Sequence, residues 1–431
     1  MRKYFGTDGI RGVYGQGMTE ALAYKAGAAF GFLFCGVCIA GQDTRVSGAS
    51  LLDAFVAGLN SAGGNALTVG IVPTPALALL VKKRRAAGGV MVSASHNPPE
   101  YNGLKLFGRG GAKLSAKEEE AVEFYIDNPD LVAADARGWV SKMRGAAEIY
   151  INDIVLGSQR LDGEKVWLDC GFGAAGAFVL DDGQGSIARE VFTRLGASVV
   201  CLNEGGDGNM INVDCGALYA ERLLEAMKGN FQCVEHCELN NGFAFDGDAD
   251  RMVMVFGDEI LDGDSVLYAL SRHREGGVVG TVMSNLALKR RVEADRKAFF
   301  AANVGDKHIL ELMLRKKCGL GGEQSGHYIL YPERTTGDGL LAAVKMAGLR
   351  GEIERLRLVP QKTVSLPCRC GIMQSSRLRA LTREAEGVLS RVLVRLSGTE
   401  PKIRIMAEDE DEGLVDRFLE RFKTIVDEQN T

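Results

Sequence analysis

The sequence predicts an α/β fold with three similar mixed α/β domains and a smaller C-terminal α+β domain around a central cleft. At 431 residues the chain is too long for a single hydrophobic core. Strand-like and helix-like segments alternate through most of it, which is typical of layered α/β sheets. The last segment instead has two antiparallel strand-like runs and a terminal amphipathic helix. We expect domains at 1–148, 149–255, 256–357 and 358–431.

Composition favours a cytoplasmic protein that binds small molecules. The formal net charge of -5 and the aromatic content of 7% provide neither a basic footprint nor stacking platforms for nucleic acid. The longest uncharged run, from Ala26 to Asp43, is rich in Ala and Gly, whereas a membrane span needs about 20 strongly apolar residues. The N-terminus has no apolar signal core. We therefore expect neither nucleic acid nor a membrane as a partner.

Apolar periodicity and capping residues define the elements of the first domain. Thr19 is the predicted N-cap of a helix that continues to about Phe34. Ser115-x-x-Glu118 forms a capping box at the start of another helix. The predicted strands are 37–40, 66–72 and 90–92, and the other helices are 47–62, 75–85 and 115–125.

The same alternation continues along the chain before it changes character near the C-terminus. The second domain is expected to contain strands 165–170 and 197–202, helix 186–195, and an acidic turn within 242–255. The third is expected to contain a strand at 278–283 and helices at 285–293, 307–316 and 337–347. The last is expected to contain strands 388–395 and 402–407 and a helix at 411–429.

The segment after the predicted strand 90–92 is the first candidate for covalent chemistry. Small and polar residues that favour turns follow this strand as far as Gly103. Ser95 lies beside His96 there, and Lys105 follows a few residues later. A hydroxyl next to an imidazole and an ammonium suggests a nucleophile or a phosphate carrier. A serine turn that only closes the strand fits this segment about equally well, so the rest of the chain must decide.

The sequence Asp-Gly-Asp-Ala-Asp-Arg at 246–251 is the sharpest electrostatic signal. Its three carboxylates, Asp246, Asp248 and Asp250, follow an apolar run and would repel one another without a cation. Hard oxygen ligands suit Mg²⁺ or Ca²⁺, but a calcium loop of the EF-hand type would need Gly and Glu where this sequence has Arg and Gly. We therefore favour a Mg²⁺ site with a position open for a phosphate oxygen over a solvated acidic turn.

Two further loops offer groups that suit a sugar phosphate. The loop at 321–327 offers a carboxylate, an amide, a hydroxyl and an imidazole, which suit hydrogen bonds to sugar hydroxyls and proton transfer at His327. Arg395 and Arg404 bracket Ser397-Gly398-Thr399, which makes an anion nest for a phosphate monoester. Read alone, the first loop also fits a structural histidine and the second a polar hairpin turn.

Cationic loops recur after strands or among glycines. Arg11 lies in a glycine-rich segment that lets the backbone approach a ligand. Arg45 and Lys307 each lie in a further loop of this kind. One or more such loops in each α/β unit favour a central cleft for an anionic ligand.

Taken together, these segments resemble the α-D-phosphohexomutase superfamily over essentially the whole chain and in the family's order. The loops around Ser95, Asp246, His327 and Arg395 are similar to its phosphoserine, magnesium, sugar-specificity and phosphate-binding loops. The variants that resemble its glucosamine branch are F-G-T-D-G-I-R-G at 5–12, T-V-M-S-N at 281–285, V-G-D-K at 304–307 and T-T-G-D-G at 335–339.

The resemblance implies a role for each candidate residue. The catalytic group would be Ser95 as phosphoryl carrier, Lys105 and His327 for proton transfer, Arg11 against the phosphoserine, and His96. The magnesium ligands would be Ser95, Asp246, Asp248 and Asp250. The substrate-binding residues would be Arg251, Lys307, Glu323, Ser325, Arg395, Ser397, Gly398, Thr399 and Arg404.

The activity that this resemblance implies is interconversion of glucosamine 6-phosphate and glucosamine 1-phosphate. Phosphorylated Ser95 would give its phosphoryl group to the substrate, glucosamine 1,6-bisphosphate would turn over in the cleft, and the other phosphate would return to Ser95. One Mg²⁺ per chain would neutralise charge on the transferring group. Closure of the fourth domain would exclude water. The product would feed UDP-N-acetylglucosamine and cell-wall synthesis, and a homodimer is left open.

Three alternatives remain at this stage. The nearest is a phosphoglucomutase or phosphomannomutase with the same chemistry, and the others are a non-catalytic sugar-phosphate sensor and a metal-dependent sugar phosphatase. The chain also departs from the family pattern in its second domain. Phe172 stands where the family usually has Asn, and Gly176–Gly185 is predicted to be an insertion.

Overall fold

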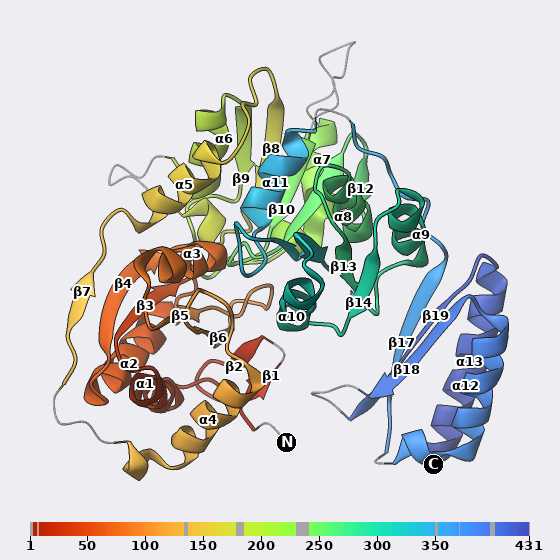
Figure 1. The fold of residues 1–431 in the computed structure, drawn as a ribbon, viewed down its shortest axis with the longest axis horizontal. Helices are drawn as coiled ribbons and strands as arrows, with labels where there is room; N and C mark the ends of the chain where they lie inside the picture. Colours follow the sequence, from red (N-terminus) through yellow and green to blue (C-terminus); the bar gives the residue numbers. More distant parts are fainter. Residues whose placement is uncertain are drawn as a thin grey trace. The chain divides into compact units, whose positions relative to one another are not determined.

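Two compact units make up the chain in the computed structural model (Figure 1). The first contains Met1–Val282 and Phe300–Glu354, and the second contains Met283–Phe299 and Arg355–Thr431. Three mixed sheets lie in the first unit and a fourth in the second, so the predicted α/β fold class is confirmed. The proposed boundaries of four domains stay predictions. The structure describes residues 3–6, 8–132, 137–177, 185–229, 241–349, 352–369, 371–396 and 401–430.

The first sheet places the Ser95 segment at the carboxyl end of a buried strand. In pairing order its strands are β1 (Phe5–Gly6), β2 (Gly9–Val13), β6 (Tyr101–Phe107), β5 (Gly88–Val92), β3 (Val37–Gln42), β4 (Asn65–Ile71) and β7 (Val140–Lys142). The strands β5, β3, β4 and β7 run parallel, whereas β6 is antiparallel to both of its neighbours. Ligand sites of α/β sheets lie outside the carboxyl ends of parallel strands, and the loop after β5 leaves the sheet there.

Helices cover both faces of this sheet. The helices are α1 (Glu20–Phe34), α2 (Gly48–Ser61), α3 (Thr74–Arg84), α4 (Ala116–Asp127) and α5 (Ala146–Leu156). The first core joins α1, α2 and α4 to the strands, whereas Leu77 of α3 packs on the opposite face. Thr19 caps α1 by accepting a hydrogen bond from Leu22 N, and both bonds of the predicted capping box at Ser115 are present.

One prediction for this domain was wrong. We expected turns to continue as far as Gly103, but Asn102 and Gly103 lie inside β6, and Lys105 projects from the same strand. Tertiary contacts override the turn preference here. The Asn102 amide is buried and donates to Ser47 Oγ at 2.9 Å, and a Cβ on Gly103 would lie 2.5 Å from the carbonyl oxygen of Ile10 on β2.

The second and third sheets position two of the predicted loops. We call them the acidic loop (246–251) and the histidine loop (321–327). The second sheet pairs in the order β12 (Glu259–Leu261), β11 (Met252–Phe256), β10 (Asn241–Phe245), β8 (Lys165–Asp169) and β9 (Ser198–Leu202). The third pairs in the order β14 (Phe299–Ala302), β13 (Val278–Thr281), β15 (Leu320–Gly322) and β16 (Tyr328–Leu330). The accompanying helices are α6 (Ile187–Leu195), α7 (Ala220–Gly229), α8 (Gly263–Arg272), α10 (Asp306–Lys316) and α11 (Gly339–Ala347). The acidic loop joins β10 to β11, and His327 directly precedes β16.

Phe172 stands where the family usually has Asn, and its backbone has a conformation that asparagine adopts readily. Phe172 has φ +52°, in the left-handed region where Asn is tolerated far better than an aromatic residue. Its N–H donates to the carbonyl of Asn203 at 2.9 Å, and its carbonyl accepts from Thr44 Oγ1 at 2.7 Å. These two contacts hold the left-handed turn. Most of the predicted insertion Gly176–Gly185 lies outside the described residues.

The second unit is a small α+β layer. Its sheet pairs in the order β17 (Gln361–Pro367), β19 (Lys402–Glu408) and β18 (Arg391–Leu396), all antiparallel, as Figure 1 shows. Its helices are α9 (Leu286–Ala294), α12 (Ser376–Val388) and α13 (Glu412–Asn430). Apolar residues of α12 and α13 form one core with the sheet. Val388 ends α12 rather than starting the next strand, which corrects the predicted start of that strand.

The Ala/Gly-rich run that ends at Asp43 is explained by close packing between α1 and α2. A Cβ on Gly27 would lie 2.0 Å from the carbonyl oxygen of Phe55, and one on Gly58 would lie 1.9 Å from that of Tyr24. The small residues therefore let two helix backbones touch. In the described parts of the chain, no helix has the length and apolar character that crossing a membrane requires.

We expect Gly27→Ala to destabilise the first unit by about 2 kcal/mol or more, because the added methyl group would force the two helices apart. Gly387→Ala is the matched control. Gly387 is exposed in α12 with open space around its Cα, so alanine there should stabilise the helix by up to about 1 kcal/mol. Calorimetric unfolding of the two variants measures both effects. A Gly27→Ala protein as stable as the wild type would contradict the close-packing argument.

Candidate active site

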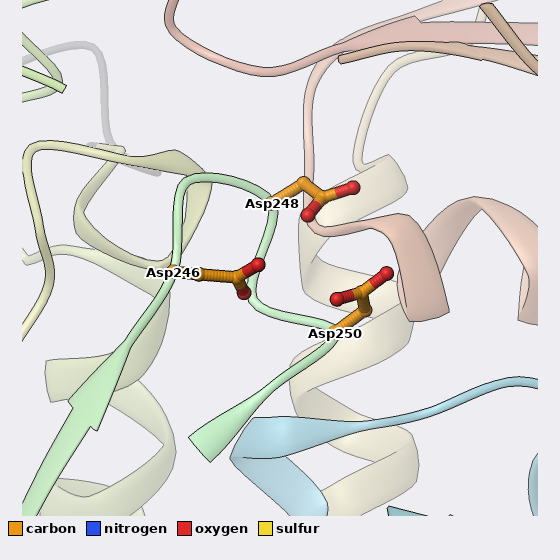
Figure 2. A group of neighbouring side chains, drawn as sticks. All are labelled: Asp246, Asp248 and Asp250. Carbon is orange, nitrogen blue, oxygen red and sulfur yellow. The ribbon is translucent and has the colours of Figure 1, made fainter. Parts of the chain in front are cut away.

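The Ser95 loop and the acidic loop meet inside the first unit. Ser95 Oγ donates to Asp246 Oδ2 at 2.6 Å, and both residues are fully buried. The His96 Nδ1 atom lies 3.3 Å from the same Oγ. Asp246, Asp248 and Asp250 each point an oxygen toward a common point, all within 4.8 Å of one another (Figure 2). The structure thus brings together Ser95, the predicted nucleophile, and the three predicted metal ligands.

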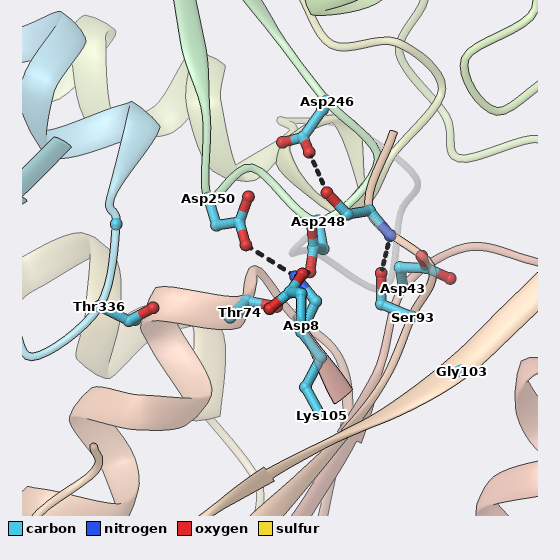
Figure 3. Close-up of polar contacts among 12 residues, drawn as sticks. Asp8, Asp43, Thr74, Ser93, Gly103, Lys105, Asp246, Asp248, Asp250 and Thr336 are labelled. Atoms are coloured by element: carbon cyan, nitrogen blue, oxygen red, sulfur yellow. Dashed lines mark hydrogen bonds and ion pairs between the residues drawn. The ribbon is translucent and has the colours of Figure 1, made fainter. Parts of the chain in front are cut away.

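Hydrogen-bond donors surround this acidic cluster only in part. Lys105 Nζ lies 2.6 Å from Asp248 and 2.7 Å from Asp250, and Thr74 donates to Asp248 (Figure 3). The Arg251 N–H donates to Asp246 at 3.2 Å. Among the residues that the structure describes, nothing donates to the Oδ1 atoms of Asp248 and Asp250, although both atoms are buried.

The charges of the cluster shift the pKa values of its members in opposite directions. Burial raises the pKa of Asp246 to about 7, and the charges of Asp250 and Asp248 add to this effect. Burial also opposes ionisation of Asp250, but the Lys105 ammonium outweighs it and lowers the pKa of that carboxyl well below its ordinary value. Three buried carboxylates, two of which have an oxygen that accepts no hydrogen bond from the described residues, are a donor set that fits a hard divalent cation.

A network of ion pairs, in which acidic and basic side chains alternate, extends outward from this cluster. Asp8 pairs with both Arg11 and Lys113 and lies 3.2 Å from Lys105 Nζ. The Lys113 Nζ atom lies 2.7 Å from Asp306, which faces His327. These pairs connect β6 and the loop between β1 and β2 with the start of α10. Each buried charge therefore has a partner of opposite sign.

His327 lies between two carboxylates. Its Nδ1 is 3.7 Å from Asp250, and its Nε2 is 3.4 Å from Asp306. Although burial lowers the basicity of the ring, these two acidic groups raise the pKa of His327 to about 10. The Gly337 N–H points at Nε2 from 2.9 Å and opposes protonation of that nitrogen. The two carboxylates therefore favour the charged ring at pH 7, and neutralising either of them would lower the pKa of His327.

Six of the predicted site residues line a cavity of about 180 Å³. They are Arg11, His96, Asp250, Arg251, Glu323 and His327, and Asp8, Lys113 and Asp306 also line it. Burial, Arg251 and Arg11 lower the pKa of His96 to about 4, so its ring is neutral at pH 7. A small pocket with two arginines and a neutral imidazole above a buried serine suits an anionic ligand.

The histidine loop is ordered by its own carboxylate. Glu323 accepts the Gly305 N–H at 2.9 Å and the hydroxyl of Ser325 at 3.3 Å. Ser325 itself is exposed. This loop therefore presents Glu323 at the wall of the cavity and leaves the Ser325 hydroxyl near the surface.

Two basic residues that we expected to face an anionic ligand are paired with other groups of the protein. Lys307 lies 3.1 Å from Glu119 and lines a neighbouring cavity of about 420 Å³ instead of the one above Ser95. Arg45, which we expected to line the cleft, is 2% exposed and donates to backbone carbonyls of the Ser95 loop. The expectation for Arg45 was wrong because a buried guanidinium satisfied by five acceptors is not available to a ligand.

The two arginines of the predicted phosphate loop lie in the second unit. Arg395 on β18 and Arg404 on β19 are direct cross-strand partners. Burial and the charge of Arg404 lower the pKa of Arg395. Like charges opposite each other destabilise a sheet unless an anion lies between them. Ser397, Gly398 and Thr399 lie outside the described residues.

Four residues of the charge network were not predicted as site residues. They are Asp8, Thr74, Lys113 and Asp306. Asp8 and Asp306 lie inside motifs that we identified, but we assigned roles only to the cations in those motifs, Arg11 and Lys307. Thr74 and Lys113 carry no local signal, because only the packing of separate sheets brings them to the cluster.

Comparison with known proteins assigns the class. Family models of phosphoglucomutase/phosphomannomutase match domain I at residues 2–132, domain III at 257–355 and the C-terminal domain at 369–425. A structure of a phosphoglucomutase/phosphomannomutase family protein from Burkholderia thailandensis superposes with a TM-score of 0.82 at 22% identity, covering 100% of this chain and 98% of that one. N-acetylphosphoglucosamine mutase of Aspergillus fumigatus, solved with GlcNAc-6P and magnesium, gives a TM-score of 0.63 at 17% identity, with 100% and 96% coverage. The class is that of the phosphohexomutases.

Closer relatives define the family within this class. The phosphoglucosamine mutase of Methylobacillus flagellatus is 37% identical, and that of Thermotoga maritima is 38% identical. Each alignment covers 99% of this chain and 99% of the relative. The chain therefore belongs to the phosphoglucosamine mutase family.

We expect Asp246→Asn to weaken binding of a divalent cation at least about ten-fold, which is about 1.4 kcal/mol, because one of three charged ligands is lost. The metal-free variant should melt no lower than the wild type, since removing a buried charge relieves repulsion among the carboxylates. Calorimetric titration with Mg²⁺ and thermal unfolding measure the two effects. Asp207→Asn, at an exposed carboxylate, is the control and should leave the affinity unchanged. Equal affinities in all three proteins would remove the aspartates from the metal site.

Proposed function

We propose that this protein is a phosphoglucosamine mutase, which interconverts glucosamine 6-phosphate and glucosamine 1-phosphate. The observation that carries the proposal is the Ser95 hydroxyl, 2.6 Å from Asp246 in a buried cluster of three carboxylates. The family relatives of the chain support the same activity. A soluble sugar phosphate would be the ligand, and the cytoplasm the proposed location.

The first half of the reaction transfers the phosphoryl group of phosphorylated Ser95 to the C1 hydroxyl of glucosamine 6-phosphate. The bond from phosphorus to Ser95 Oγ breaks, a bond from phosphorus to the sugar oxygen forms, and the hydroxyl proton passes to a base. We propose His327 and Lys105 for proton transfer, because both lie at the acidic cluster. A cation held by that cluster would lower the pKa values of both groups, so that either could then accept the proton. The products are glucosamine 1,6-bisphosphate and free Ser95.

The second half runs in the opposite sense at the other end of the sugar. The Ser95 hydroxyl attacks the phosphorus at O6, O6 takes up the proton as the leaving group, and glucosamine 1-phosphate departs. Asp246 accepts the Ser95 hydroxyl hydrogen bond and so orients the oxygen lone pairs toward the incoming phosphorus. Arg11, beside Asp8, would contact the phosphate on Ser95, and neutral His96 would border it.

The residues of the acidic cluster suit one Mg²⁺ per chain. Asp246, Asp248, Asp250 and the oxygen of Ser95 would hold it, and the buried Asp248 Oδ1, which accepts no hydrogen bond from the described residues, supports this assignment. When bound, the ion supplies positive charge against the charge of the transferring phosphoryl group.

The remaining predicted residues would bind the substrate. Glu323 and Ser325 would take sugar hydroxyls, Arg251 and Lys307 would add positive charge, and Arg395 with Arg404 would hold the phosphate that is not being transferred. The opposed arginines support the last role, because an anion relieves their repulsion. Ser397, Gly398 and Thr399 would complete that nest with hydroxyl and backbone donors.

A second candidate function is the same chemistry on glucose or mannose phosphates. Burial of Ser95 against the acidic cluster favours any phosphohexomutase equally, so the sugar-binding loop must discriminate. Turnover of the 6-phosphates of glucosamine, glucose and mannose separates the two candidates. A sugar-phosphate sensor would bind without isomerisation, and a phosphatase would release free phosphate.

We expect Ser95→Ala to lose at least about 1,000-fold in turnover while keeping its fold, because the phosphoryl carrier is gone. Intact-protein mass should show one phosphate on the wild type after incubation with glucose 1,6-bisphosphate and none on the variant. Ser115→Ala, which removes only an exposed helix cap, should lose about 1 kcal/mol of stability and keep full turnover. Isomerisation at the wild-type rate by Ser95→Ala would refute the assignment.

A further inference from the structure

The backbone of the Ser95 loop is bound by a buried arginine that the proposed function does not use. Arg45 follows β3, and its Nη2 donates to the carbonyl oxygens of Ser95 at 2.8 Å and Asn97 at 2.7 Å. Its Nη1 donates to those of Pro98 at 2.5 Å and Tyr101 at 2.9 Å. One guanidinium therefore satisfies four carbonyls within a single loop, and its planar, rigid set of donors fixes their relative positions.

A side chain from the segment after β9 of the second sheet binds two of these four carbonyls as well. Asn212, in the segment between β9 and α7, donates through Nδ2 to the carbonyl oxygens of Ser95 at 2.9 Å and Asn97 at 3.1 Å. These two carbonyls thus each accept from both Arg45 and Asn212. A Cβ on Gly247 would lie 2.8 Å from the Ser95 carbonyl oxygen and 3.0 Å from Asn212 Nδ2. The backbone of the acidic loop therefore lies directly against this contact.

The conformation that these contacts hold is one that serine rarely adopts. Ser95 has φ +54°, in the left-handed region. Its N–H donates to Ser93 Oγ at 2.9 Å, its carbonyl is bound by Arg45 and Asn212, and its Oγ donates to Asp246. Such a conformation persists only when the surrounding structure over-determines it. With the carbonyl directed toward Arg45 and Asn212, the side chain is directed toward the acidic cluster.

We propose that Arg45 and Asn212 are positioning residues for phosphoryl transfer, which fix the loop carbonyls so that Ser95 Oγ faces Asp246, Asp248 and Asp250. This inference rests on the proposed function and adds two residues to it. Neither residue contacts the phosphate or the sugar; both act through the backbone of the loop. Because Asn212 lies in the segment that follows β9 of the second sheet, the orientation of Ser95 depends on packing between the first sheet and this segment.

The test compares Arg45→Lys, Asn212→Asp and the double variant with the wild type. Lysine keeps the charge but cannot reach four carbonyls, and aspartate keeps the shape and the tolerance for left-handed φ, which Asn212 adopts at +59°, but offers no donor. We expect kcat to fall at least about ten-fold in each single variant, with KM for glucosamine 6-phosphate within about two-fold of the wild type. Phosphorylation of Ser95 by glucose 1,6-bisphosphate, followed by intact mass, should slow by the same factor. The double variant should lose less than the product of the single effects, because both residues bind the same two carbonyls.

Arg334→Lys is the matched control. Arg334 is 3% exposed and pairs with Asp338 at 2.5 Å and Asp153 at 2.8 Å, and its hydrogen bonds in the described structure do not include the Ser95 loop. It should lower the melting temperature as much as Arg45→Lys and leave kcat unchanged. Folded single variants with wild-type kcat and wild-type phosphorylation rates would overturn the positioning role, as would an equal loss of kcat in Arg334→Lys. A wild-type protein without isomerase activity would overturn the proposed function itself, and this role with it.

Discussion

Burial of three like charges at one point is the constraint on which the rest of this structure depends. Asp246, Asp248 and Asp250 follow one strand within a short loop and have almost no exposure to water. In such surroundings their mutual repulsion is severe. The surrounding sheets supply a lysine, two hydroxyl donors and a backbone N–H, and His327 Nδ1 lies 3.7 Å from Asp250 Oδ1. Among the described residues, no hydrogen bond reaches the Oδ1 atoms of Asp248 and Asp250. A divalent cation at this point would offset the remaining repulsion among the three carboxylates.

The same constraint explains why charges alternate outward from the cluster. Lys105 neutralises part of the cluster and is in turn close to Asp8, whose other partners are cations. Asp306 then balances Lys113 and faces His327. Several members have more than one partner of opposite sign: Lys105 pairs with Asp248 and Asp250 as well as Asp8, and Lys113 pairs with both Asp8 and Asp306. An apolar replacement in this series would therefore remove part of the compensation of at least one buried charge. The network therefore links the sheets of the first unit in their functional arrangement.

Local patterns predicted the elements that depend on local physics. The N-cap Thr19, the capping box at Ser115 and the apolar runs around the acidic loop all gave elements within a few residues of those observed. The strand β6 was missed because Asn102 and Gly103 favour a turn in isolation, whereas a buried amide contact and close backbone packing decide the outcome. Such contacts join residues that are distant in the sequence, so no local window contains them.

The candidate site was predictable to the extent that its chemistry is concentrated in loops. Alternate carboxylates and a serine beside a histidine are visible in one segment each, and the structure brings them together. The partners of these groups could not be foreseen in the same way. Arg45 seemed from its loop to be a ligand for an anion, yet its acceptors are carbonyls some fifty residues further along the chain. Charge alone does not show whether a cation faces a ligand or the protein itself.

The opposed arginines of the second unit have a consequence for handling the protein. Arg395 and Arg404 face each other across a hairpin, and nothing in their own strands carries a compensating negative charge between them. Their repulsion is screened by salt and is relieved most by a multivalent anion. An anion that bound between them would add its binding free energy to the stability of the hairpin, so the anion chosen for the purification buffer would affect the stability of this small sheet.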